Sequence, residues 1–102
     1  IYKMEVKFNK QDSTLTVAIS GNIDTVTAPE LDTKLQENLS GIKDLILDFA
    51  AVDYISSAGL RVILMANQQL EDADGTMTIK NSNDDVRDVF EMTGFDSLLN
   101  LD

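Results

Sequence analysis

The sequence predicts a single α/β domain, in which a mixed sheet of four to five strands begins with a β-hairpin and carries helices packed on it. Three observations predict this fold. Two runs near the start alternate apolar and polar residues, a consecutive apolar run lies in the middle, and later stretches repeat apolar residues at helical spacing. The chain has 102 residues, which suffices for one hydrophobic core, so we expect one domain over residues 1–102.

The first two elements are expected to form an antiparallel hairpin. Residues 2–8 alternate apolar with charged side chains, as a half-exposed strand does, and residues 14–20 alternate again. The polar residues 9–13 between them are typical of a turn. Residues 21–24 are expected to end the second strand, because a glycine at position 21 permits a sharp change of direction.

A helix is predicted to follow from the signals around position 27. Thr27 and Glu30 have the spacing of a capping box, and Pro29 is tolerated in a first helical turn because its missing N–H would have no partner there. The apolar stripe of this helix is Leu31, Leu35 and Leu39. Residues 40–41 are expected to close it.

The middle of the chain predicts a buried strand that leads into a second helix. Residues 42–49 contain consecutive apolar side chains, which are expected when helices cover both faces of a strand. A turn is predicted at residues 53–56, and helical spacing continues to about Asp72. The apolar residues of this second helix are Leu60, Ile63, Leu64 and Leu70.

The last third of the chain predicts a strand, a helix and a docked end. Residues 76–80 alternate as a strand, and either Ser82 or Asn83 can cap a helix that Gly94 ends. Asp84 and Asp85 suit the positive end of its dipole, and its buried stripe is Val86, Val89 and Phe90. The apolar residues expected to dock the chain end on the core are Phe95, Leu98, Leu99 and Leu101.

Composition excludes several classes of function. The chain has no histidine and no cysteine, which removes the usual general base, zinc ligands, disulfides and thiol chemistry. We therefore expect no enzyme activity, cofactor or metal, and a reducing compartment such as the cytoplasm. A net charge of −10 disfavours direct nucleic-acid binding and favours a protein partner with a neutral or basic face. No apolar stretch approaches the roughly 20 residues that a membrane-spanning helix needs, and the start does not resemble a signal peptide.

Three acidic residues and two serines are the candidate chemical groups. Asp24, Asp48 and Asp53 lie near predicted strand ends, where carboxylates either pair as acids, bind a metal or, more commonly, cap turns. Ser56 and Ser57 precede the second helix, without the glycine pattern of a nucleophile elbow or a P-loop. One interpretation is that a serine only caps the helix, which is worth about 1 kcal/mol. The other is a phosphorylation switch, since a helix N-terminus tolerates the added negative charge.

Two motifs resemble a known family. Residues 53–60, Asp-Tyr-Ile-Ser-Ser-Ala-Gly-Leu, follow the strand Leu-Ile-Leu-Asp-Phe and resemble the signature of STAS domains, specifically bacterial anti-sigma factor antagonists. Residues 21–28, Gly-Asn-Ile-Asp-Thr-Val-Thr-Ala, are similar to the family's Gly-x-(Leu/Ile)-Asp-x-x-Thr-Ala stretch. With the order of elements, the resemblance covers nearly the whole chain and implies a STAS-type fold.

The resemblance also implies a partner-switching mechanism. The family pattern Met-Asp-Ser-Ser/Thr-Gly-Leu places its phosphorylated serine on Ser57, while Ser56 stands where aspartate is usual and is a second possible acceptor. The unphosphorylated form would bind an anti-sigma factor that is also a serine kinase, and so free the sigma factor. Phosphorylation would end this binding until a serine phosphatase restores it. The candidate partner contacts are Asp24, Thr25, Tyr54, Ser56, Ser57, Gly59 and Arg61.

An alternative interpretation keeps the fold and drops the switch. The domain would then be a constitutive interaction subunit of a signalling or transport assembly, with Ser57 serving only as a helix cap. Substitutions at Ser57 would leave assembly unchanged in that case.

Overall fold

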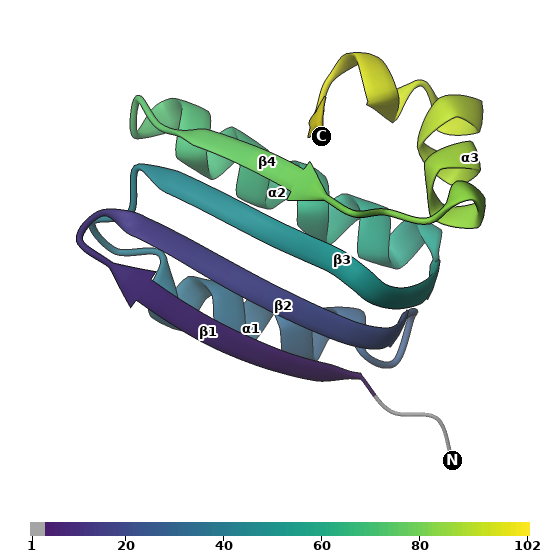
Figure 1. Cartoon of the computed structure of the whole chain (residues 1–102), viewed down its shortest axis with the longest axis horizontal. Coiled ribbons are helices and arrows are strands. Elements are labelled where there is room, and N and C mark those ends of the chain that lie inside the picture. Colours follow the sequence, from purple (N-terminus) through teal and green to yellow (C-terminus); the bar gives the residue numbers. More distant parts are fainter. Residues whose placement is uncertain (1–3) are drawn as a thin grey trace.

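The computed structural model describes residues 4–102 and shows one five-stranded sheet whose strands follow the chain order β1-β2-β3-β4-β5 (Figure 1). The first pair is antiparallel and the other three pairs are parallel, which confirms a mixed sheet with an N-terminal hairpin. The strands are β1 (Glu5–Gln11), β2 (Thr14–Ile23), β3 (Asp44–Ile55), β4 (Thr76–Lys80) and β5 (Asn100–Leu101). The helices are α1 (Ala28–Asn38), α2 (Ser57–Asp72), α3 (Asp84–Thr93) and the short 3-10 helix η1 (Phe95–Ser97).

The hairpin turn is tighter than predicted, and its second strand is longer than predicted. The part of the first predicted strand before residue 4 lies outside the described residues, and β1 continues through most of the predicted turn to Gln11. Asp12 takes a left-handed backbone conformation, with a φ of 56°, that short polar residues adopt more readily than others. Strand β2 ends within the predicted residues 21–24, although Gly21 does not turn the chain away from the sheet. Gly21 has a φ of 93°, the register shifts beside it, and the strand continues to Ile23.

The core lies between one face of the sheet and helices α1 and α2 (Figure 1). Five of the seven predicted stripe residues of these helices are buried, and Leu39 and Leu64 are partly buried. The sheet residues buried against the helices include Leu15, Val17, Ile19, Leu45, Leu47, Phe49, Met77 and Ile79. No helix in residues 4–102 is long and apolar enough to cross a membrane.

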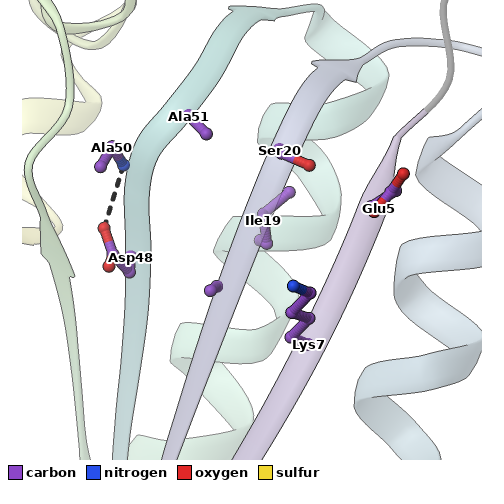
Figure 2. Close-up of a pocket in the computed structure, with 8 residues that line it drawn as sticks. Glu5, Lys7, Ile19, Ser20, Asp48, Ala50 and Ala51 are labelled. Atoms are coloured by element: carbon purple, nitrogen blue, oxygen red, sulfur yellow. Dashed lines mark hydrogen bonds between the residues drawn. The ribbon is translucent and has the colours of Figure 1, made fainter.

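The prediction that helices cover both faces of the central strand is wrong. Both α1 and α2 lie on the same face, so the opposite face of β3 is open (Figure 1). Ala50 is exposed there and Ile46 is only partly buried, because burial alternates along most of β3. A hollow of about 230 Å³ lies on this open face (Figure 2). Its lining residues are Glu5, Lys7, Ala18, Ile19, Ser20, Asp48, Ala50 and Ala51.

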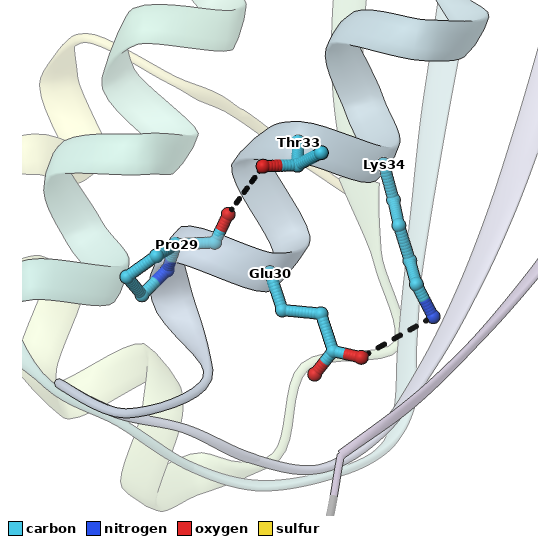
Figure 3. A network of polar contacts seen from close by, with 4 residues as sticks. All are labelled: Pro29, Glu30, Thr33 and Lys34. Carbon is cyan, nitrogen blue, oxygen red and sulfur yellow. Dashed lines mark hydrogen bonds and ion pairs between the residues drawn. The ribbon is translucent and has the colours of Figure 1, made fainter.

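The start of α1 differs from the predicted capping box. Thr27 is the N-cap residue, but its side chain makes no capping hydrogen bond. Its Oγ1 instead donates to the carbonyl oxygen of Asn22 at 2.8 Å and accepts from the backbone N–H of Asp24 at 2.8 Å. Glu30 pairs with Lys34 at 3.5 Å rather than with the cap (Figure 3). Thr27 therefore fixes the preceding loop, while Pro29 occupies the first turn as predicted.

The C-terminal elements follow the predictions, with one strand added. Asn83 caps α3 by accepting the backbone N–H of Val86 at 2.8 Å, and Gly94 ends the helix with a φ of 79°. Leu99 is buried as expected, whereas Leu98 is 59% exposed and does not dock on the core. The chain then adds β5 beside β4, an element too short for its periodicity to be recognised in the sequence.

Candidate partner-binding site

The connection from β3 to α2 differs from the turn predicted at residues 53–56. Strand β3 continues to Ile55, which pairs with Ile23 of β2, and α2 begins two residues later. The buried residues in this part of β3 are Phe49, Val52 and Ile55. These residues are three positions apart because the register between β2 and β3 shifts here. The sequence therefore lacks the alternation of apolar and polar residues by which a strand is recognised. The serine pair therefore lies directly between the end of β3 and the first turn of α2.

The two adjacent serines have different structural roles. Ser56 is the N-cap of α2, and its Oγ accepts the backbone N–H of Gly59 at 3.2 Å. Its own backbone N–H donates to the carbonyl oxygen of Ile23 at 2.8 Å, and the residue is half-buried. Ser57 is the first helical residue and is exposed. The interpretation of Ser57 as the helix cap is therefore wrong, because Ser56 is the cap.

Gly59 holds α2 close to the sheet. A Cβ atom at this position would lie 2.7 Å from Cγ2 of Ile23 and 2.9 Å from the carbonyl oxygen of Ile23. Gly59 is also buried, so it is not an exposed contact as the sequence suggested. Its contribution to the site is to let the N-terminus of α2 pack against β2 and β3.

Asp24 organises the loop that precedes α1. Its Oδ1 accepts the backbone N–H groups of Val26 at 2.9 Å and Thr27 at 3.0 Å. The hydrogen bond from the backbone of Thr27 is the main reason why the pKa of Asp24 lies below its ordinary value. Asp24 thus caps a turn, as carboxylates at strand ends commonly do, and it fixes the loop that places Thr25 beside the first turn of α2.

The other two candidate carboxylates lie outside this arrangement. Asp48 accepts the backbone N–H of Ala50 at 3.0 Å and Nδ2 of Asn81 at 3.1 Å. The hydrogen bond from Ala50 is the main cause that lowers the pKa of Asp48. Asp53 is exposed on β3. Between residues 4 and 102, no three acidic side chains are grouped in a way that would hold a metal ion.

A groove between α1 and α2 begins beside the serine pair. It has a volume of about 390 Å³, and Thr25 and Arg61, two of the predicted contacts, lie on it. The residues that line it are Thr25, Ala28, Pro29, Asp32, Ala58, Arg61, Val62 and Met65. Tyr54 lies outside the groove, at the end of β3, and is 52% exposed.

Sequence reasoning missed two exposed apolar residues near this end of the molecule. Val26 is 84% exposed in the loop before α1, and Met65 is 52% exposed on α2. Monomeric domains commonly expose single apolar side chains, but several close together mark a surface for another protein. The signal available in the sequence was that Met65 falls outside the apolar stripe of its helix, whereas Val26 lies in a loop and had no such signal. The groove that begins beside Ser57 thus combines the apolar side chain of Met65, the hydroxyl of Thr25 and one cation, Arg61.

Comparisons with known proteins agree with these features. The model of the STAS domain family matches residues 5–102. BtrV of Bordetella bronchiseptica, whose name assigns it provisionally to the anti-sigma factor antagonists, is 34% identical over 96 residues. The match covers 93% of this chain and 83% of that protein.

Solved structures show the same fold. An anti-sigma factor antagonist from Mycobacterium paratuberculosis has a TM-score of 0.86 at 25% identity, covering 97% of this chain and 85% of that one. The phosphorylated form of the Bacillus protein SpoIIAA has a TM-score of 0.75 at 17% identity, covering 96% and 91% of the two chains. The chain therefore belongs to the STAS domain family, within its group of bacterial anti-sigma factor antagonists.

Proposed function

We propose that this domain is an anti-sigma factor antagonist that phosphorylation of Ser57 switches off. In its unphosphorylated form it would bind an anti-sigma factor that is also a serine kinase, and so release the sigma factor in the cytoplasm. A serine phosphatase would reverse the modification. The observation that carries this proposal is the division between the two serines: Ser56 caps α2, and Ser57 is exposed beside it. Phosphate can therefore be added to Ser57 while the cap stays in place.

The chemistry requires little from this chain. The kinase would transfer the γ-phosphoryl group of ATP to Oγ of Ser57, forming a new P–O bond and releasing ADP, while a base of the kinase takes the hydroxyl proton. The phosphatase would hydrolyse the same bond with water. This domain supplies an accessible hydroxyl at a helix N-terminus. The helix dipole there favours the roughly 1.5 to 2 negative charges that a phosphate adds.

The surface next to Ser57 explains why a phosphate would end binding. A partner docked there would cover the exposed side chains of Val26, Tyr54 and Met65, so a phosphate on Ser57 would be buried at the same interface. Removing a phosphate from water is costly even when a cation pairs with it, and about 1.4 kcal/mol of lost binding energy already weakens affinity tenfold. We propose that Thr25, Tyr54 and Arg61 contact the partner directly, and that Asp24, Ser56 and Gly59 hold the surface in shape. The net charge of −10 favours a partner with a neutral or basic face.

The test is phosphorylation by the cognate anti-sigma factor kinase with ATP, followed by mapping of the modified residue. We expect one phosphate on Ser57. Ser56→Ala should still be modified at Ser57, whereas Ser57→Ala should not be modified and should bind the partner constitutively. Ser57→Asp should bind at least about tenfold more weakly. If Ser57→Asp bound as tightly as the unmodified chain, the switch would be wrong, and a constitutive interaction subunit would be the better description.

A further inference from the structure

We infer that Arg61 is the internal counter-charge of a phosphate on Ser57, an inference that rests on the proposed phosphorylation. The two residues are four positions apart within α2, which spans Ser57–Asp72. Side chains at this spacing are neighbours on one helix face, with Cβ atoms about 5–6 Å apart. Ser57 and Arg61 are both exposed, so a phosphate on the first and the guanidinium of the second share the same solvent-facing surface.

Arg61 is not committed to another ion pair. Within residues 4–102 the ion pairs at 4.0 Å or less join Lys34 to Glu30 and Lys80 to Asp102, and neither involves Arg61. Asp32 lines the same groove as Arg61, but it does not come within that distance. The guanidinium is therefore available to pair with a new anion.

The surroundings of Ser57 make this cation important. Arg61 is the single basic residue of α2, and the charged residues of the adjoining strand end and loop are Asp53 and Asp24. The backbone N–H of Gly59, which would otherwise face a new anion, already donates to Ser56. A phosphate at Ser57 thus depends on Arg61 for a charged donor. The planar guanidinium suits this role because it can donate two parallel hydrogen bonds to phosphate oxygens.

The pairing would extend the effect of phosphorylation from the N-terminus of α2 to the groove. Arg61 lines the groove between α1 and α2 together with Thr25 and Met65. Once it pairs with the phosphate, its guanidinium is drawn toward the N-terminus of α2 and is no longer available to a carboxylate of the partner. Phosphorylation would therefore change two parts of the docking surface, the end of α2 and the adjoining groove.

The experiment measures the phosphate directly and needs no kinase. The full chain is produced with phosphoserine incorporated at position 57 during translation, and the second ionisation of the phosphate is titrated by ³¹P NMR. A neighbouring cation favours the dianion and lowers this pKa. We expect a lower pKa in the wild type than in Arg61→Gln, an intermediate pKa in Arg61→Lys, and a difference that shrinks as salt is added.

Arg87 provides the matched control, because it is an exposed arginine on α3. The Arg87→Gln variant should titrate like the wild type. Equal pKa values in the wild type, Arg61→Gln and Arg87→Gln would overturn the inference, as would equal effects of the two glutamine substitutions. Arg61→Lys keeps the positive charge and tests the same pairing independently of Arg61→Gln. Failure of a kinase to modify Ser57 would count against the proposed function only, because here the phosphate is built in.

Discussion

Replacing Ser56 with alanine removes the hydroxyl that caps α2, and the neighbouring serine provides a matched comparison. Oγ of Ser56 makes one hydrogen bond, from the backbone N–H of Gly59 at 3.2 Å, so the loss should be that of a single cap, about 1 kcal/mol. For a domain of this size, about 1 kcal/mol lowers the melting temperature by roughly 4–8 °C. Ser57→Ala makes the same chemical change at an exposed helical position, where alanine is the better helix former, so we expect an unchanged or slightly higher melting temperature.

Thermal unfolding followed by circular dichroism measures both variants. A third variant, Ser56→Asp, keeps a capping oxygen and places a negative charge at the start of the helix, so it should be at least as stable as the wild type. The reasoning would be refuted if Ser57→Ala lowered the melting temperature as much as Ser56→Ala, because the cap would then not reside on Ser56.

Three further predictions concern packing, pH and binding. Gly59→Ala would place a Cβ 2.9 Å from the carbonyl oxygen of Ile23, so its free energy of unfolding, measured by urea denaturation, should fall by about 1–3 kcal/mol. An alanine variant as stable as the wild type would contradict the close approach of α2 to the sheet. Folding lowers the pKa of Asp24, so this carboxylate stabilises the fold above its unfolded-state pKa, and the stabilisation is lost as pH falls through the folded-state pKa. Below about pH 4, the stability of the wild type should therefore fall more steeply than that of Asp24→Asn. Parallel curves of stability against pH would contradict this prediction. Met65→Ser should weaken partner binding by about tenfold in calorimetry, whereas Met92→Ser, at a residue 85% exposed on α3, should not. Equal losses at both methionines would argue against the groove.

The helices were predictable because their signals are local. The buried stripe of α1 and the cap of α3, predicted at Ser82 or Asn83 and found at Asn83, depend on residues three or four positions apart. The end of β3 was not predictable in this way. Its last residues belong to the sheet because β2 continues beside them, and the register shifts remove the alternation that would reveal a strand. Strand β5 has only two residues and exists through its pairing with β4.

The candidate site shows the same division between local and tertiary information. The serine pair and the loop before α1 could be predicted from motifs, and the structure joins them through the hydrogen bond from Ser56 to Ile23. Which serine caps the helix depends on where β3 ends, so the sequence alone left it open. The exposure of Met65 agrees with its position outside the apolar stripe of α2, whereas no periodic pattern in the sequence encodes the exposure of Val26 in the loop before α1.

The proposed position of the phosphate, on the second serine rather than the first, has a physical reason. Ser56 is half-buried, its backbone N–H is bonded to Ile23, and its hydroxyl holds the cap, so a kinase that used it would have to disturb the junction between strand and helix. Ser57 is already helical and exposed, so a kinase can reach its hydroxyl without breaking a described hydrogen bond. In a chain whose net charge is −10, the added negative charge would be tolerated because the helix N-terminus and, as proposed above, Arg61 would face it. Under the proposal the fold would therefore persist in both states, and the two would differ at the surface that a partner would cover.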